Sequence, residues 1–338
     1  MPQGFYLIPH TMTRHILRSA VLFALLASAL AIKLTEPAGG FIPKKFPAII
    51  ALALYALSAI IHWIHFFRLE RRPFMLTLTL GMTVMAAGFL LRIVFSNSPF
   101  SLGLYVIMDL LIVLAPCAFL ATDYMLLARL AACFDEQIVQ SCLLLRPSRI
   151  TKVFVWSDLI TVCLQGNGAG LAVSLNPTMA KIGNTIVMLG LCLQLASFAL
   201  FTLLLFVFGW RVQTRFPDAW RPQRGRKPFT VLGTHQVGDW RILYCTMCIT
   251  SLGILNRSVF RVAEYAGGAT GFLAQHEGYF YLFDALSLWI SMSLYCFVWP
   301  TRFLSTRPRL DATELRLVEA TELRSSEATE PRKGPAFV

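Results

Sequence analysis

Charged side chains are scarce in this sequence of 338 residues. Asp, Glu, Lys and Arg make up 14% of the chain, whereas a soluble domain carries about a quarter. Hydrophobic residues make up 56%, and the mean hydropathy is +0.63. This composition excludes an ordinary soluble domain and predicts an integral membrane protein.

Several sequence features that would indicate other classes of protein are also missing. The apolar runs contain no lysine except Lys152, which lies at the edge of one run. A retinal Schiff base of the opsin kind needs a lysine inside a span and is therefore excluded. The glycine-rich run at 166–170 is not followed by Gly-Lys-Ser/Thr, so it is not a phosphate-binding loop. The cysteines fall in or near apolar runs and are not placed for extracellular disulfides. We therefore predict no bound cofactor and no enzyme activity.

Seven stretches are long and apolar enough for membrane-spanning helices, which need about 20 residues. They cover residues 46–67, 74–95, 101–129, 151–173, 183–210, 241–263 and 279–300. A helix satisfies its backbone hydrogen bonds within one segment, and runs of this length suit helices better than the strands of a barrel. We predict an all-α fold with seven transmembrane helices.

The predicted membrane domain covers residues 41–302, between an N-terminal segment at 1–40 and a tail at 303–338. An apolar run at 16–32 follows two arginines and ends in small residues, as in a signal peptide or a signal anchor. The tail repeats the sequence Ala-Thr-Glu-Leu-Arg, and its charged, low-complexity composition predicts disorder.

Basic residues are concentrated on one side of the predicted spans. They occupy the loops after the first, third and fifth spans and the tail, whereas the opposite loops hold only Lys181. Because positive residues remain on the cytoplasmic side, we predict that the membrane domain begins outside and that the tail is cytoplasmic. The net charge of +12 is then a topology signal and a contact for anionic lipids. It does not predict nucleic-acid binding.

The sixth span carries three charged residues near its predicted outer end. Arg257, Arg261 and Glu264 share one helical stripe, because they are separated by four and three residues. Charges at this depth are expensive and usually face the interior of a bundle, where they find partners. A polar cluster at the outer ends of the helices is therefore predicted from Arg92, Asp109, Arg257, Arg261, Glu264, Glu277 and Asp284. Its role is either to bind a substrate or to lock the helices together.

A second polar set is expected closer to the cytoplasm. Asp123 follows Asp109 by fourteen residues and lies on nearly the same stripe of the third span. Asp158 and Gln165 are seven residues apart in the fourth span, and Gln194 lies in the fifth. The glycines near them permit close approach of helices.

Long motifs of the chain resemble the fungal lipid-translocating exporters of the RTA-like family. The motifs are LAPCAFLATDYM at 114–125, FVWSDLITVCLQGNGAG at 154–170, RSVFRVAEYAGGATGFLAQHE at 257–277 and YLFDAL at 281–286, in this order. The family is associated with resistance to aminocholesterol compounds and with export of sphingoid long-chain bases. The resemblance implies seven spans and a multi-pass protein of the plasma membrane, with an internal membrane as the alternative location. It also implies membrane lipids and amphipathic small molecules as partners.

The chain departs from the family pattern in the second span. The family usually has an acidic residue followed by Gly-Tyr, where this chain has Met85, Gly88 and Phe89. Arg92 therefore lacks an expected partner in its own helix, and Asp123 is a candidate replacement acid.

Three functions are compatible with these residues. The resemblance and the interior acids favour a transporter of amphipathic lipids, such as sphingoid bases or sterol-like amines. A receptor or sensor of lipids or membrane stress has the same layout. A metal-dependent lipid hydrolase is the third class, for which His62 and His65, one turn apart in the first span, are the best indication. A zinc site needs at least three protein ligands, so we predict no metal site.

Overall fold

The computed structural model describes residues 42–69, 71–144, 147–172, 176–220, 237, 239–268 and 271–304. These residues form helices and no β-strand. The long helices are α2 (Lys45–Arg68), α3 (Leu76–Asn97, preceded by the short η2, Pro73–Met75), α4 (Leu102–Ala131), α6 (Pro147–Ala172), α7 (Pro177–Arg215) and α9 (Trp240–Ala266). A last long helix combines α11 (Glu277–Tyr279), the π-helical segment η3 (Phe280–Leu286) and α12 (Ser287–Phe297). The short elements are α5 (Glu136–Cys142), α8 (Pro217–Trp220), α10 (Phe272–Gln275) and η4 (Pro300–Arg302).

Six of the long helices are apolar enough to cross a membrane, namely α2, α3 with η2, α4, α7, α9 and the helix from α11 to α12. They coincide with six of the predicted spans, so the prediction of an all-helical membrane fold is confirmed. The fourth predicted span coincides with α6, which has 26 residues. This helix carries Asp158, Gln165 and Asn167 within its apolar stretch and is not among the six that are apolar enough to cross a membrane. Its crossing of the membrane stays a prediction. The signal-like run at 16–32 and the tail from 305 lie outside the described residues.

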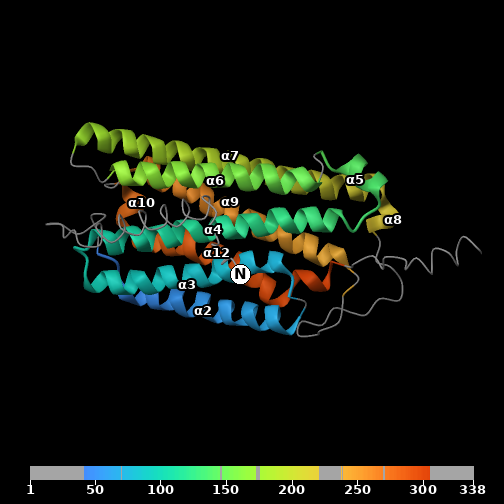
Figure 1. Cartoon of the computed structure of the whole chain (residues 1–338), viewed down its shortest axis with the longest axis horizontal. Coiled ribbons are helices and arrows are strands. Elements are labelled where there is room, and N and C mark those ends of the chain that lie inside the picture. The colour runs from blue at the N-terminus through green and yellow to red at the C-terminus, as the bar shows by residue number, and fades with distance from the viewer. Residues whose placement is uncertain are drawn as a thin grey trace, which may run out of the picture.

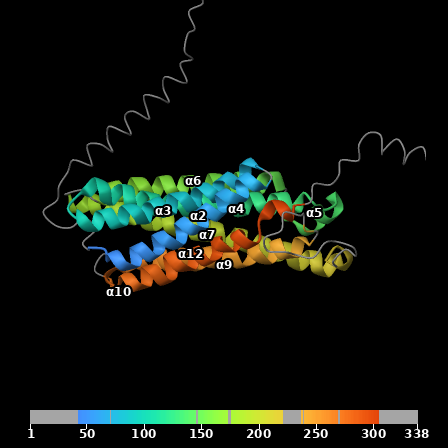
Figure 2. The same ribbon diagram turned by 90° about the horizontal axis from the view of Figure 1, so that it is seen from below.

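The long helices form a closed ring. Each one packs against the next in the chain, from α2 through α3, α4, α6, α7 and α9 to α12, and α12 packs back against α2. Figure 1 shows α6 and α7 along one edge of the bundle and α2 along the other. In the view of Figure 2, α9 and α12 lie on one side, and α4 and α6 lie on the other. Helices α5 and α8 lie at one end of the ring and α10 at the opposite end (Figure 1), and these are called the α5 end and the α10 end below.

Aromatic side chains hold α4, α6 and α7 together in the half of the ring nearer α5. The ring of Tyr124 lies edge-on to that of Phe201, with 4.6 Å between centroids, and Phe154 meets Phe201 in the same way at 5.6 Å. Such edge-to-face pairs contribute about 0.5–1.5 kcal/mol each beyond the area that they bury. Large apolar side chains on the opposite faces of α6 and α7, such as Trp156 and Leu203, are exposed. Exposed apolar faces of this kind are suited to contact with lipid.

Glycines bring α6 and α7 into close backbone contact toward the α10 end. A Cβ added to Gly183 would collide with the backbone of Ala172 and Gly168, and one added to Gly190 would collide with Gln165. Gly166 and Gly170 of the glycine-rich run face open space. The run is continuous helix in α6, so its one packed member, Gly168, serves helix approach as predicted.

Candidate functional site

A cleft of about 1400 Å³ opens at the α10 end of the ring. Its walls are the halves of α4, α6, α7 and α9 nearest that end, and they include Asp109, Gln165, Lys181 and Arg257. At the α5 end the same α7 and α9 are in contact, because the Tyr244 hydroxyl reaches the Leu205 carbonyl and lies over Gly209. The cleft is thus open at one end of the helix pair and closed at the other.

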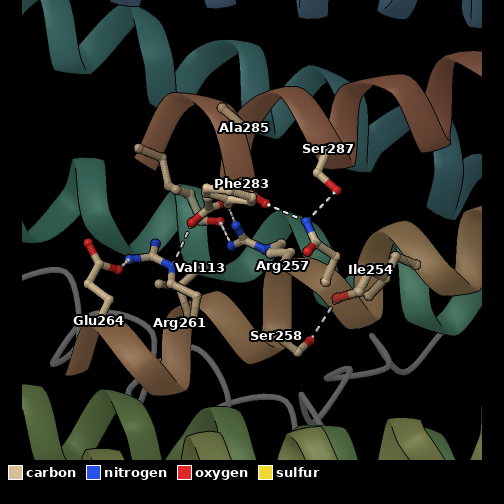
Figure 3. A network of polar contacts seen from close by, with 12 residues as sticks. Val113, Ile254, Arg257, Ser258, Arg261, Glu264, Phe283, Ala285 and Ser287 are labelled. Carbon is tan, nitrogen blue, oxygen red and sulfur yellow. Dashed lines mark hydrogen bonds and ion pairs between the residues drawn. The ribbon is translucent and has the colours of Figure 1, made fainter. Parts of the chain in front are cut away.

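Arg257 joins three helices at one wall of the cleft. It projects from α9 and forms an ion pair with Asp284 of η3, whose side chain is completely buried. Its guanidinium also donates to the carbonyl oxygen of Ile112 in α4 at 3.2 Å. Figure 3 shows Arg257 and Arg261 pointing from α9 toward the segment that carries Phe283 and Ala285.

The carbonyl that accepts from Arg257 is available because of a proline. Pro116 lies inside α4, four residues after Ile112. Proline has no backbone N–H, so the carbonyl four residues before it loses its usual helical partner. The guanidinium of Arg257 replaces that partner. The prediction from the sequence missed this contact, although a proline in the middle of an apolar span is a signal that an unpaired carbonyl lies one turn earlier.

Arg261 extends the ion-pair network toward the mouth of the cleft. It pairs with the second carboxylate oxygen of Asp284 at 2.7 Å and with Glu264 of its own helix at 3.1 Å. Its guanidinium also lies 5.5 Å from the centre of the Phe280 ring, within the range of a cation–π contact. Four of the predicted residues, Arg257, Arg261, Glu264 and Asp284, therefore form one connected network (Figure 3).

Arg92 forms a separate ion pair beside this network. It donates to Glu277 at 2.8 Å and to the Tyr281 hydroxyl at 3.1 Å, and its guanidinium lies 4.6 Å from the centre of the Phe280 ring. Glu277 also accepts from the backbone N–H of Lys44 at the start of α2. The acid that serves Arg92 thus comes from α11. Asp123 lies elsewhere, against α9 and α12, and is not the replacement partner that the family pattern suggested.

Asp109 differs from the other acids of the cleft. It is half-buried, lines the cleft and makes no hydrogen bond or ion pair with any residue that the structure describes. Tyr105 of α4 and Tyr265 of α9 also line the cleft and lie within electrostatic range of Asp109, and Arg261 lies within range of the same two tyrosines. Lys181, on the α7 wall, is exposed. A carboxylate in a half-open cleft that tyrosines also line is suited to an organic cation, because carboxylates and aromatic ring faces both attract positive charge.

The inner polar set divides into three separate sites. Gln165 and Gln194 line the cleft, where the Gln165 amide donates to Gln194 at 2.8 Å and Gln194 lies 3.7 Å from the Cys117 sulfur. Asp158 is buried, and its carboxylate faces the Tyr124 hydroxyl between α4 and α6.

Asp123 forms the third site. It is buried between α4, α9 and α12, where it meets Thr250 and Tyr295. Asp109 and Asp123 both face α9, as their shared stripe predicts, but only Asp109 reaches the cleft.

The two histidines of α2 lie against the end of the last helix. His62 is buried with its ring 5.8 Å from that of Trp299, and His65 stacks on the same indole at 5.3 Å. His65 also lies within hydrogen-bond distance of the Cys296 carbonyl, at 2.9 Å. Among the described residues, no group of three or more His, Cys, Asp or Glu side chains is arranged to hold a metal ion. In the structure, the histidines pack against an aromatic side chain.

Comparison with curated proteins gives several relatives from Saccharomyces cerevisiae. Protein RTM1 is 29% identical over 208 residues, which cover 62% of this chain and 61% of that protein. Protoporphyrin uptake protein 1 is 28% identical over 211 residues, which cover 62% of each chain. Sphingoid long-chain base transporter RSB1 is 25% identical over 278 residues, which cover 75% of this chain and 70% of the relative.

The match spans about three fifths of the length of the first two of these relatives. No solved structure matches the chain. The model of a family described as RTA1 like protein matches residues 78–307. Because that match covers well over half of the sequence, and because six helices are apolar enough to cross a bilayer, the chain belongs to the RTA1-like family of multi-pass membrane proteins.

Proposed function

We propose that the protein translocates amphipathic lipids that carry a cationic amine, such as sphingoid long-chain bases or sterol-like amines. The observation that carries the proposal is a cleft lined by two tyrosines and by Asp109, an acid without a partner among the described residues. Every arginine of the cleft already has an acidic partner. A ligand amine that enters the cleft therefore meets Asp109 as the available carboxylate, while the apolar side chains of the walls accept its hydrocarbon chain.

Two relatives support the transport of amphipathic molecules. One is named for the transport of sphingoid long-chain bases and another for the uptake of protoporphyrin. Both names describe movement of large, partly apolar molecules. Transport of this kind by our chain, and the resistance to membrane-active compounds that export would confer, are part of the proposal.

The orientation is also proposed from the charge distribution. The ends of α4, α6 and α7 near α5 carry Arg129, Arg149, Lys152, Arg211 and Arg215. Because basic residues favour the cytoplasmic side, the α5 end faces the cytoplasm and the cleft opens to the outside or, in an internal membrane, to the lumen. We propose the plasma membrane as the location, and surface labelling of intact cells separates the two locations.

The test is export of a labelled long-chain base from cells that express the wild type, Asp109→Asn or the matched control Glu136→Gln. Glu136 is an acid of α5, outside the cleft. A charged hydrogen bond contributes about 1.5–3 kcal/mol, so we expect Asp109→Asn to reduce export about 10-fold to 100-fold at equal protein level, and Glu136→Gln to leave it unchanged. The N-acetylated base, which keeps the chain but loses the positive charge, should be exported poorly by the wild type. Equal export by Asp109→Asn and the wild type would contradict the proposal.

A lipid sensor is the second candidate function. The observation that favours it is the closed α5 end, where Tyr244 of α9 fills the space against Leu205 and Gly209 of α7. A ring that is open at one end and closed at the other also suits a receptor that binds its ligand from outside. Saturable binding of the labelled base by the purified protein, without any flux in proteoliposomes, would favour the sensor over the transporter.

A further inference from the structure

Asp123 is an acid buried without a cation. It lies in α4 with no exposed surface, and no basic side chain of the described residues forms an ion pair with it. Its two contacts are hydroxyl groups. Tyr295 of α12 donates to one carboxyl oxygen at 2.8 Å, and the Thr250 hydroxyl of α9 lies 3.4 Å from the other.

A count of the hydrogen atoms at this site favours the neutral acid. The Thr250 hydroxyl has one proton, and its nearest acceptor is the carbonyl of Met247 at 2.9 Å. If the Thr250 hydroxyl donates its hydrogen bond to that carbonyl, one oxygen of an ionised Asp123 is left without a hydrogen-bond donor. A protonated Asp123 removes the deficit, because its own O–H can donate to the Thr250 oxygen while its other oxygen accepts from Tyr295. Every polar atom of the site then has a partner.

The surroundings of Asp123 point to the same state. The titratable groups that face it are Tyr124 of its own helix, Cys248 of α9 and Tyr295 of α12, all of which are ordinarily neutral. On the α6 side, Asp158 lies beyond Tyr124. Because none of these groups supplies a positive charge, an ionised Asp123 would bear the full desolvation penalty of a buried carboxylate.

The site of Asp123 and the wall of the cleft are built from the same three helices. At the cleft, Arg257 of α9 contacts Ile112 of α4 and Asp284 of η3. At the inner site, Thr250 of α9 meets α4 and α12. Thr250 and Arg257 are seven residues apart and lie on one stripe of α9, about 10 Å apart along the helix axis. A shift of α9 that changes the cleft therefore also moves the Thr250 hydroxyl relative to Asp123.

We propose that Asp123 is a proton-binding site whose loading is coupled to movement of α9. The ionised carboxylate takes up one proton from water when α9 moves away and admits water. It becomes the neutral acid in the closed packing described above, and it returns the proton to water in the reverse step. Proton binding stands on the geometry of Asp123 alone. Its use to drive lipid movement rests on the proposed function.

The first arm of the test is infrared spectroscopy of the full-length protein in lipid membranes. We expect the wild type at neutral pH to show the C=O band of a protonated carboxylic acid, which shifts in D₂O and is missing from Asp123→Asn. The matched control Asp109→Asn should keep the band. Tyr295→Phe should keep it too, but at a higher frequency, because the C=O group loses its donor. A wild type without the band, from mildly acidic to mildly alkaline pH, would overturn the proton site.

The second arm is flux of a labelled long-chain base into proteoliposomes with and without a pH gradient. One coupled proton changes the accumulation ratio by up to about tenfold per pH unit. We expect the wild type to respond to the gradient and Asp123→Asn to move the base without responding to it. Wild-type flux that ignores the gradient overturns the coupling. An infrared band without any flux overturns the proposed transport, whereas proton binding by Asp123 would stand.

Discussion

The buried ion pair between Arg257 and Asp284 leads to a quantitative prediction for stability. Asp284 has no exposed side-chain surface, and Arg257 has 6%. The substitution Asp284→Asn keeps the shape of the side chain but leaves Arg257 without a counter-charge in a dry place. Removal of one partner from a buried pair costs about 3–5 kcal/mol. Because Arg261 also loses a contact at 2.7 Å, we expect a loss of unfolding free energy at the upper end of this range.

The matched control is Glu264→Gln. Among the described residues the Glu264 carboxylate pairs with Arg261, and its side chain is 17% exposed, so water compensates part of the lost charge. We expect a cost of about 1 kcal/mol, as for partly solvated pairs. Thermal unfolding of the detergent-purified proteins, followed by tryptophan fluorescence, measures both. A difference of several kcal/mol corresponds to a lowering of the midpoint on the order of 10 °C for Asp284→Asn.

A double variant distinguishes the loss of a pair from a general disturbance of packing. Arg257→Met with Asp284→Leu removes both charges and fills the space with apolar atoms, and such replacements are often neutral or stabilising. We expect it to be more stable than either Asp284→Asn or Arg257→Met alone. If Asp284→Asn unfolds at the same temperature as the wild type, the pair does not hold η3 to α9 and the reasoning is refuted.

Three other predictions follow from neighbouring features. An interior proline costs a helix about 3 kcal/mol, so Pro116→Ala should stabilise α4 by restoring a helical N–H donor to the Ile112 carbonyl. In the wild type that carbonyl already accepts from Arg257, so the gain in stability should be larger in an Arg257→Met background. Equal gains in both backgrounds would contradict the role of the proline. Gly183→Ala should destabilise the protein by about 1–3 kcal/mol through a backbone collision, whereas the control Gly170→Ala, which faces open space, should not. A C-terminal tag should be protected from protease in intact cells and a tag inserted between α6 and α7, at 173–176, should be cleaved, and the reverse pattern would overturn the orientation.

The position of the helices was predictable because a helix must have about 20 apolar residues to span the hydrocarbon core of a bilayer. Apolar runs of this length therefore mark the helices in the sequence. The prediction placed the span of α9 at 241–263, against Trp240–Ala266 in the structure. Helix α6 shows where this signal weakens. Its polar residues Asp158 and Gln165 are the ones that face other helices, so the residues that make it less apolar are also those that place it in the ring.

The composition of the ion-pair network was predictable, but its connections were not. Helical spacing places Arg257, Arg261 and Glu264 on one stripe, and the cost of buried charge requires partners for them. Spacing within one helix cannot tell which acid on another helix is in reach. The sequence therefore did not separate Asp284, which is fully paired, from Asp109, which faces the cleft without a partner. That distinction depends on how the helices are arranged around the ring.

Because η3 is a π-helix, the contacts of residues 280–286 depend more on the number of residues in the segment than on which apolar residues it contains. A π turn holds one residue more than an α turn, so the side chains before and after η3 follow two different angular registers. Deletion of one exposed residue, such as Leu282, would remove the extra residue of the turn and change the angle between Tyr281 and Asp284 around the helix axis. The contacts with Arg92 and with Arg257 could then not form together. We therefore expect that apolar residues of 280–286 can be exchanged among relatives, whereas insertions and deletions within the segment are not tolerated.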